Sequence, residues 1–330
     1  MKNKKKFLLG VGLLVAVINC VIAFSYAVAS YLMKIAIYRE GEEKVKSAGR
    51  TKKLLTGFEC AEEYMDVLDR AEEKLKKLKT EKVVIKSSDG ESLVGHWHET
   101  ENPKRVIIAM HGWRSTWERD FGMISDFWID NGCSVLYVEQ RGHSESGGKY
   151  LGFGLLERYD CMDWILWVIE NKSKVLPIYL AGISMGAATV LMTAGFKMPE
   201  NVHGIIADCG FTSPRDIWKH VSEKNLHLSY FMIGNMADSI CKRKIKISSK
   251  DYSVIEAMSN NKIPILFIHG TDDHFVPVEM TYNNFKACNA PKRIFVVPGA
   301  DHGMSYYMDT KGYEAEISSF WKKFDKIPVE

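Results

Sequence analysis

The stretch that most constrains the fold is residues 180–188, where an apolar run meets the pattern Gly-x-Ser-x-Gly at Gly182, Ser184 and Gly186. The apolar residues 178–181 are short enough for a buried strand, and the small residues after Gly186 suit a helix packed closely on a sheet. A sharp strand-to-helix turn crowds the backbone, so a Cβ atom at either glycine would clash. The pattern predicts a strand, a turn that exposes the serine hydroxyl, and a helix whose free N–H groups begin beside it.

This pattern alone is a weak signal, because an ordinary Gly/Ser turn before a helix has the same letters. The rest of the chain supplies the context, since strand-like apolar runs alternate with helix-like segments. The predicted strands are 82–86, 92–98, 105–110, 134–138, 178–181, 202–207, 263–268 and 293–297, and the predicted helices after the first two strands include 117–131, 155–170, 278–287 and 312–326. Such alternation predicts a mostly parallel sheet with helices on both faces.

Polar clusters follow several of these strands at their carboxyl ends, where ligands bind in parallel α/β sheets. A serine hydroxyl is a poor nucleophile at neutral pH and needs a base in contact with it. Histidine suits that task, and a carboxylate must fix its tautomer and stabilise its charged form. Asp273 follows one strand and His302 follows the next, so Ser184, Asp273 and His302 stand in the order expected when the serine comes first.

With these motifs in place, residues 80–327 resemble the α/β-hydrolase family, and the chain is similar to bacterial single-pass members with serine hydrolase activity. The matching motifs are His111-Gly112, Arg141-Gly142-His143-Ser144, Gly182-Ile183-Ser184-Met185-Gly186, Gly270-Thr271-Asp272-Asp273-His274-Phe275-Val276-Pro277 and Gly299-Ala300-Asp301-His302-Gly303. The resemblance implies a doubly wound, mostly parallel α/β-hydrolase sheet with a helical cap and an N-terminal transmembrane helix.

The resemblance also implies roles for individual residues. The family's acid lies four residues before the proline of the Val-Pro pair, which favours Asp273, with Asp272 as the alternative, and the family histidine corresponds to His302. The family geometry implies an oxyanion hole made by the backbone N–H groups of Trp113 and Met185. The pair Glu139-Gln140 departs from the commoner Asp-His or Asp-x, and we expect this departure to affect loop anchoring rather than catalysis.

The N-terminal segment predicts a membrane anchor. No residue from Phe7 to Met33 is charged, and as a helix this run spans about 40 Å, more than the roughly 30 Å of a bilayer core. A cleaved signal peptide is the alternative, because Ala27-Val28-Ala29 resembles a cleavage site, but its apolar region would be shorter. The lysines in residues 2–6 favour a cytoplasmic N-terminus and an outside catalytic domain, although basic residues after the span nearly balance them.

Three parts are therefore expected: a basic tip and anchor at 1–38, a charged linker with an amphipathic helix at 39–80, and an α/β-hydrolase domain at 81–330. The linker's helix is predicted over residues 60–78, with its apolar stripe packed on the domain. A cap is expected at about 212–258, a segment too long for a simple connection. Its apolar residues either roof the serine and shape the substrate site or only pack on the sheet.

These features favour a serine hydrolase that cleaves a carboxylester, thioester or related apolar acyl substrate through an acyl-serine. A serine peptidase of the same fold is the alternative, although the long cap does not supply the large propeller-like domain that some such peptidases carry. A non-catalytic, membrane-anchored interaction protein is the second alternative. We expect no cofactor and no metal, since the seven cysteines lack paired spacing, and the net charge of +3 argues against nucleic-acid binding. The sequence does not indicate an oligomeric state.

Overall fold

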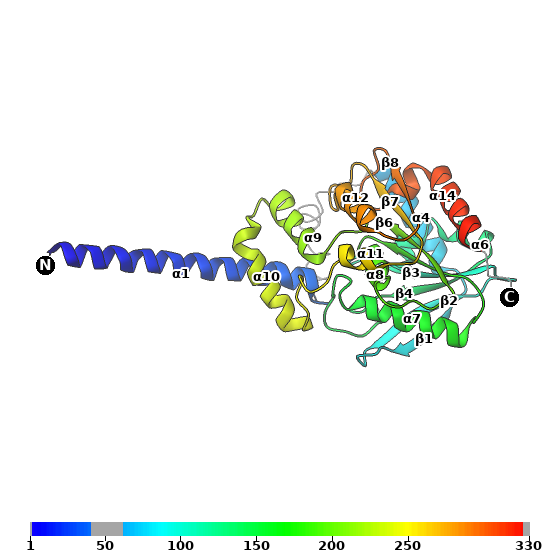
Figure 1. Cartoon of the computed structure of the whole chain (residues 1–330), viewed down its shortest axis with the longest axis horizontal. Coiled ribbons are helices and arrows are strands. Elements are labelled where there is room, and N and C mark those ends of the chain that lie inside the picture. The colour runs from blue at the N-terminus through cyan, green and yellow to red at the C-terminus, as the bar shows by residue number, and fades with distance from the viewer. Residues whose placement is uncertain (1, 41–61, 326–330) are drawn as a thin grey trace.

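A computed structural model describes residues 2–40 and 62–325 of the chain (Figure 1). These residues form an eight-stranded sheet of order β1-β2-β4-β3-β5-β6-β7-β8. The strands are β1 (Glu81–Lys86), β2 (Ser92–His98), β3 (Arg105–Met110), β4 (Cys133–Glu139), β5 (Ile178–Ile183), β6 (Val202–Asp208), β7 (Ile265–Gly270) and β8 (Lys292–Val297). Only β2 pairs antiparallel to its neighbours β1 and β4, and every pair from β4 to β8 is parallel, as the alternating pattern predicts.

Helices cover both faces of this sheet because alternate residues of its strands point to opposite sides. On β3, Val106 and Ile108 belong to one buried cluster, whereas Ile107 and Ala109 belong to the other. The first cluster includes side chains from α7 (Glu157–Asn171), α8 (Met185–Thr193), α11 (Val254–Asn260) and α12 (Val278–Ala287), and the second from α4 (Glu62–Lys76), α5 (Trp117–Phe121), α6 (Ser125–Asp130) and α14 (Thr310–Phe324). The short α13 (Ser305–Met308) precedes α14.

One predicted helix is wrong, because the segment 117–131 forms two helices, α5 and α6, separated at Gly122. A Cβ atom on Gly122 would lie 2.7 Å from the backbone carbon of Ala71, so α4 crosses this break at backbone contact. The interruption is tertiary in origin and leaves the apolar spacing of the sequence unchanged. The predicted helix 60–78 corresponds to α4 from Glu62 onward, and its first two residues lie outside the described residues.

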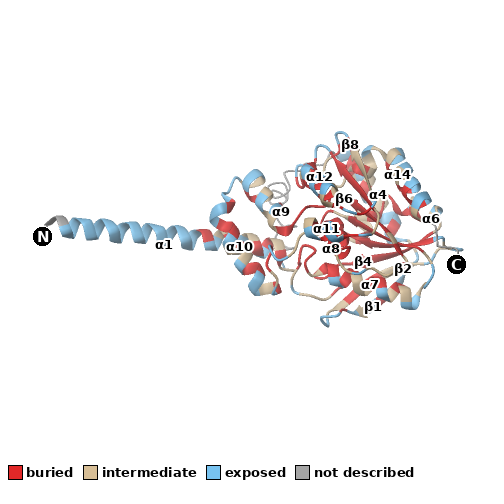
Figure 2. Cartoon of the chain, in the orientation of Figure 1, coloured by how far each residue is buried: buried red, intermediate tan, exposed pale blue. Residues whose placement is uncertain are grey.

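The N-terminal helix α1 (Lys2–Ile37) projects from one end of the domain (Figure 1). By length and composition it could cross a membrane, a test that signal sequences and some core helices also pass. Residues 4–24 are all exposed, as Figure 2 shows, whereas Ala29, Met33 and Ile37 are buried in the main core. The helix therefore has a free apolar part and a packed end.

The packed end of α1 lies against the cap, which lies at the end of the domain from which α1 projects (Figure 1). The cap consists of α9 (Pro214–His220), a π-helical turn η1 (Val221–Asn225) and α10 (Tyr230–Ile245), and α11 follows it. Helix α10 crosses α1 where α1 enters the domain. Helices α9 and α10 and the turn η1 lie within the segment 212–258 that the sequence marks as a cap, and α11 begins inside it and ends at Asn260.

Close packing between the serine turn and β3 generates a first prediction. A Cβ atom on Gly186 would lie 1.8 Å from the carbonyl oxygen of Met110, which cannot move without disrupting β3. We expect Gly186→Ala to lower the free energy of unfolding by about 3 kcal/mol or more, measured by urea titration.

Gly90→Ala is the control, because Gly90 has a positive φ of 91° but no atom near the added Cβ. Backbone strain alone should cost about 1–2 kcal/mol there. Equal losses for the two variants would contradict the packing argument.

Candidate active site

The turn between β5 and α8 holds the Ser184 side chain at the carboxyl edge of the sheet. Ser184 has φ 56° and ψ −116°, a region that non-glycine residues rarely adopt. The turn is fixed on both sides, since the Ser184 N–H donates to the Asp208 carbonyl at 2.9 Å and the Ala188 N–H donates to the Ser184 carbonyl at 3.0 Å. A Cβ on Gly182 would lie 2.4 Å from the Gly186 backbone, so both glycines of the motif are required by contact.

Ser184, His302 and Asp273 come together in one hydrogen-bonded chain, although they lie far apart in the sequence. His302 Nε2 lies 2.9 Å from Ser184 Oγ, and His302 Nδ1 lies 2.7 Å from Asp273 Oδ2. The alternative acid Asp272 is exposed and contacts the neighbouring Thr271 hydroxyl instead. The structure therefore places all three sequence-predicted side chains in contact and separates Asp272 from them.

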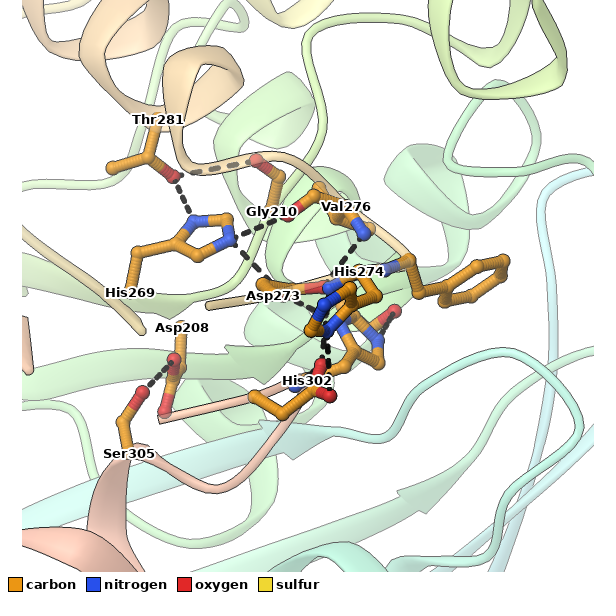
Figure 3. A network of polar contacts seen from close by, with 12 residues as sticks. Asp208, Gly210, His269, Asp273, His274, Val276, Thr281, His302 and Ser305 are labelled. Carbon is orange, nitrogen blue, oxygen red and sulfur yellow. Dashed lines mark hydrogen bonds and ion pairs between the residues drawn. The ribbon is translucent and has the colours of Figure 1, made fainter. Parts of the chain in front are cut away.

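Asp273 is a buried carboxylate that is held by several donors (Figure 3). Its Oδ1 accepts the backbone N–H groups of Phe275 at 2.9 Å and Val276 at 2.7 Å, while its Oδ2 faces His302 and lies 3.0 Å from His269 Nε2. Burial raises the pKa of Asp273, but the charge of His302 and these hydrogen bonds outweigh burial and hold the pKa well below its ordinary value. Asp273 is therefore ionised at neutral pH.

His269 is a member of this network that the sequence did not single out. Its Nδ1 lies 2.7 Å from the Thr281 hydroxyl, and its Nε2 lies 2.8 Å from the Val276 carbonyl as well as near Asp273 (Figure 3). The Nε2 side of the ring therefore faces two acceptors, and the Nδ1 side faces a hydroxyl. The available signal was the position of His269 near the carboxyl end of β7, four residues before Asp273.

The buried Asp273 carboxylate changes the pKa of His302. Burial lowers the pKa of its imidazole, but the adjacent Asp273 carboxylate outweighs burial, so the pKa lies well above its ordinary value. The thiol of Cys209 also lies beside His302, and burial raises the pKa of that thiol to about 11. The thiol is therefore neutral at neutral pH, and the Asp273 carboxylate is the charge next to His302 under those conditions.

The loop after β3 lies against Ser184. A Cβ on Gly112 would lie 3.3 Å from the Ser184 Cβ, so Trp113 follows at the point of closest approach. Among the described residues, no hydrogen-bond partner is found for the backbone N–H of Trp113 or of Met185. Within the part of the chain that the structure describes, neither predicted oxyanion donor is therefore occupied by a protein acceptor.

Two buried histidines support this loop. His111 Nε2 accepts the Gln140 N–H at 3.1 Å, and His143 Nε2 accepts the Arg114 N–H at 3.1 Å. Burial lowers the pKa of each imidazole, so both stay neutral and act as acceptors. The Gln140 side chain also donates to the His111 carbonyl, and Glu139 lies 2.8 Å from His96 Nε2. Glu139 and Gln140 therefore contact loop and strand groups in this structure.

An apolar pocket lies beside the triad. Phe275 lines it and also packs edge-on against the His302 ring, with 5.0 Å between ring centroids. Trp113 and Phe153 form a second side of the pocket. Its cap side consists of Ile217, Trp218, Val221, Leu226, Tyr230 and Ile233. The remaining wall is the packed end of α1, which nothing in the sequence pattern places in this pocket.

One group of potential metal ligands is present among the residues that the structure describes. Cys209, Asp273 and His302 place one ligand atom each within 4.8 Å of one another. Both ring nitrogens of His302 already face hydrogen-bond partners, Asp273 on one side and Ser184 on the other. An ion bound there would have to break the chain to the serine, so the geometry fits proton transfer better than metal binding.

Comparison with known proteins decides the family. The pattern that defines the prolyl oligopeptidase family matches residues 120–326, which is more than half of the chain. The chain belongs to the prolyl oligopeptidase family. Its fold is the α/β-hydrolase fold, so the resemblance and the fold class expected from the sequence are confirmed.

The individual proteins that match this chain share only about a fifth to a quarter of its residues. An uncharacterized protein of Bacillus subtilis, YqkD, is 26% identical over 72% of this chain and 77% of its own length. The esterase Pf2001 of Pyrococcus furiosus superposes with a TM-score of 0.63 at 21% identity, covering 77% of this chain and 94% of that one. The acylaminoacyl peptidase of Pyrococcus horikoshii superposes with a TM-score of 0.57 at 20% identity, covering 78% and 44%. At these identities the superpositions show the fold alone.

Proposed function

We propose that this prolyl oligopeptidase family member is a serine hydrolase in which Ser184, His302 and Asp273 are the catalytic residues. The observation that carries the proposal is the unbroken contact chain, with 2.9 Å from serine to histidine and 2.7 Å from histidine to aspartate. A base must lie within about 2.6–3.2 Å of the proton that it removes, and both distances satisfy this. The carboxylate holds the imidazole in the tautomer whose Nε2 accepts that proton.

The proposed reaction is acyl transfer. Ser184 Oγ attacks the substrate carbonyl as His302 takes the hydroxyl proton, and the N–H groups of Trp113 and Met185 bind the oxyanion that forms. His302 then gives its proton to the leaving alcohol or thiol, and the acyl group stays on Ser184. Water attacks this acyl-serine with His302 as base, which releases the acid and restores the serine. In each half of the reaction His302 takes up one proton and then releases it, and no cofactor is needed.

An ester or thioester of an apolar acid is the substrate class that the pocket supports. Its walls are apolar side chains, and the pocket adjoins Trp113, whose backbone is the proposed oxyanion donor. A peptidase remains the second candidate, favoured by the name of the family itself.

The proposed location is a membrane, with α1 as a retained single span and the catalytic domain outside the cytoplasm. Retention is supported by Ala29, at the cleavage-like site, which is 1% exposed within the core, so cleavage there would cut a packed helix. The lysines at the N-terminal tip support the orientation. The described cysteines are free, and all but Cys20 are buried, so they could stay unpaired in an oxidising compartment.

Labelling with a fluorophosphonate probe tests the serine chemistry. We expect the full-length protein to be labelled and Ser184→Ala to lose all labelling, because the probe needs an activated serine hydroxyl. Ser144→Ala is the control at an exposed serine outside the triad, and it should label normally. Absence of labelling in the unmodified protein would favour a non-catalytic interaction protein. Hydrolysis of p-nitrophenyl butyrate but not of peptide p-nitroanilides would separate an esterase from a peptidase.

The pH dependence of labelling tests the role of Asp273. Only neutral His302 can accept the proton, so the labelling rate should fall as pH decreases through the histidine pKa, with a midpoint above 6.5. Asp273→Asn removes the charge that raises this pKa and leaves burial to lower it. We expect its midpoint below 6.5 and its rate roughly 10³- to 10⁴-fold lower. The same change at Asp272, which is exposed, should alter neither value; an unchanged midpoint in Asp273→Asn would contradict the assignment.

Protease accessibility tests the orientation. Trypsin added to intact spheroplasts should digest the folded domain from its exposed surface lysines if the domain lies outside the cytoplasm, while a cytoplasmic marker protein stays intact. Protection until the membrane is permeabilised would place the domain inside and contradict the proposed orientation.

A further inference from the structure

The pocket beside the triad has one wall that comes from outside the hydrolase domain. Five residues of α1 line it: Ala29, Leu32, Met33, Ile35 and Ala36. They face the cap helices α9 and α10, and Trp113 and Phe275 connect the pocket to the serine and the histidine. The same helix that is proposed to anchor the protein therefore also completes its substrate site.

The end of α1 is also bonded directly to the oxyanion loop. The Trp113 indole Nε1 donates to the Ala36 carbonyl at 2.9 Å. The Arg114 guanidinium donates to the Ile35 carbonyl at 2.6 Å and to the Tyr38 carbonyl at 2.6 Å. A helix leaves its last carbonyls without intrahelical partners, so these side chains satisfy the C-terminal end of α1 and fix its position relative to the loop.

The free part of α1 sets where this pocket lies relative to a bilayer. The exposed apolar run from Phe7 to Phe24 spans about 27 Å as a helix, close to the roughly 30 Å of a hydrocarbon core. The packed residues begin immediately after it, with Ser25 at 6% and Ala29 at 1% exposure. A membrane that covers the free run therefore ends where the cap and the pocket begin (Figure 2).

The cap carries further signs of membrane contact on the same side. In the first turn of α10, Phe231 is 86% exposed and Met232 is 41% exposed. The other end of α10 is basic, with Lys242, Arg243 and Lys244 in its last turn, and Arg243 bonds the Tyr26 hydroxyl of α1 at 2.9 Å. Exposed apolar side chains and a basic helix end together suit the interface of an anionic membrane.

We propose that the packed end of α1 is a specificity-determining wall, and that the pocket takes the long acyl chain of a lipid ester drawn from the bilayer that α1 crosses. A long acyl chain suits the site, because the cavity is lined almost wholly by apolar atoms. The acyl chain of the lipid leaves the bilayer beside α1 and enters the pocket between α1 and the cap. This route places the ester carbonyl next to Ser184. This inference rests on the proposed serine hydrolase function and adds the substrate source and the role of α1.

Substitutions on α1 test the wall without touching the triad. Ala29→Phe fills the pocket side of the helix, whereas Ala27→Phe adds the same ring at an exposed position two residues earlier. Full-length variants in phosphatidylcholine vesicles are compared on p-nitrophenyl butyrate and p-nitrophenyl palmitate. For Ala29→Phe we expect the palmitate-to-butyrate ratio of kcat/KM to fall at least about tenfold, because each excluded methylene loses burial. Ala27→Phe should keep the ratio.

A second variant covers the case in which Ala29→Phe fails to fold. Met33 lies one turn further along the same face of α1 and also lines the pocket. Met33→Ala should leave fluorophosphonate labelling intact and change the palmitate-to-butyrate ratio by about fourfold or more, the worth of one methylene contact. An unchanged ratio in a labelled variant would overturn the wall, while loss of labelling and ester hydrolysis in the unmodified protein would overturn the serine hydrolase itself.

The source of the lipid is tested by where the substrate is placed. A palmitoyl ester lipid is incorporated either in the vesicles that hold the protein or in separate protein-free vesicles. We expect hydrolysis in the shared vesicles at least about tenfold faster, since the chain must enter from the surrounding bilayer. Equal rates in the two arrangements, with labelling intact, would show uptake from solution and overturn the bilayer route.

Discussion

Backbone contact between the β5–α8 turn and the end of β3 is the constraint on which the rest of the site depends. The turn can approach β3 only because Gly186 carries no Cβ, and it can close on itself only because Gly182 carries none, while Ser184 between them has a positive φ. Strain of this kind persists only where the surrounding structure over-determines it. Here the hydrogen bond from the Ser184 N–H to Asp208 and the packing of α8 on the sheet provide that surrounding.

The electrostatics of the site depend on the Asp273 carboxylate, which is buried and surrounded by hydrogen-bond donors. Asp273 would be unfavourable as an isolated buried anion, but two backbone N–H groups and His269 leave it fully bonded. Its Oδ2 atom also faces His302, and the negative charge there raises the pKa of the His302 imidazole. Neutral His111 and His143, in contrast, serve as fixed acceptors that hold the loop opposite, so similar side chains have different roles because their neighbours differ.

The sequence predicted all eight strands to within a few residues and placed the three triad residues at the carboxyl edge of the sheet, because these features depend on local periodicity and on motif order. The apolar run 105–110 and the Ser184 turn are examples, and each needs only its neighbours in the chain to be recognised. It could not predict the break at Gly122, which is imposed by α4, or the burial of Ala29, which is imposed by the cap. His269 escaped notice for the same reason, since its importance comes from the fold around Asp273 and not from its own spacing.

The bonds from Trp113 and Arg114 to the last turn of α1 bear on how the protein is prepared for study. A shortened form that begins after residue 40 is the usual choice for obtaining a soluble sample of a single-span protein. In this molecule that truncation would remove five lining residues, expose the cap helices to water and leave an indole N–H and a guanidinium group without their acceptors. Crystals or assays of such a fragment would report on an opened site, so the intact chain in detergent or nanodiscs is the sample that preserves it.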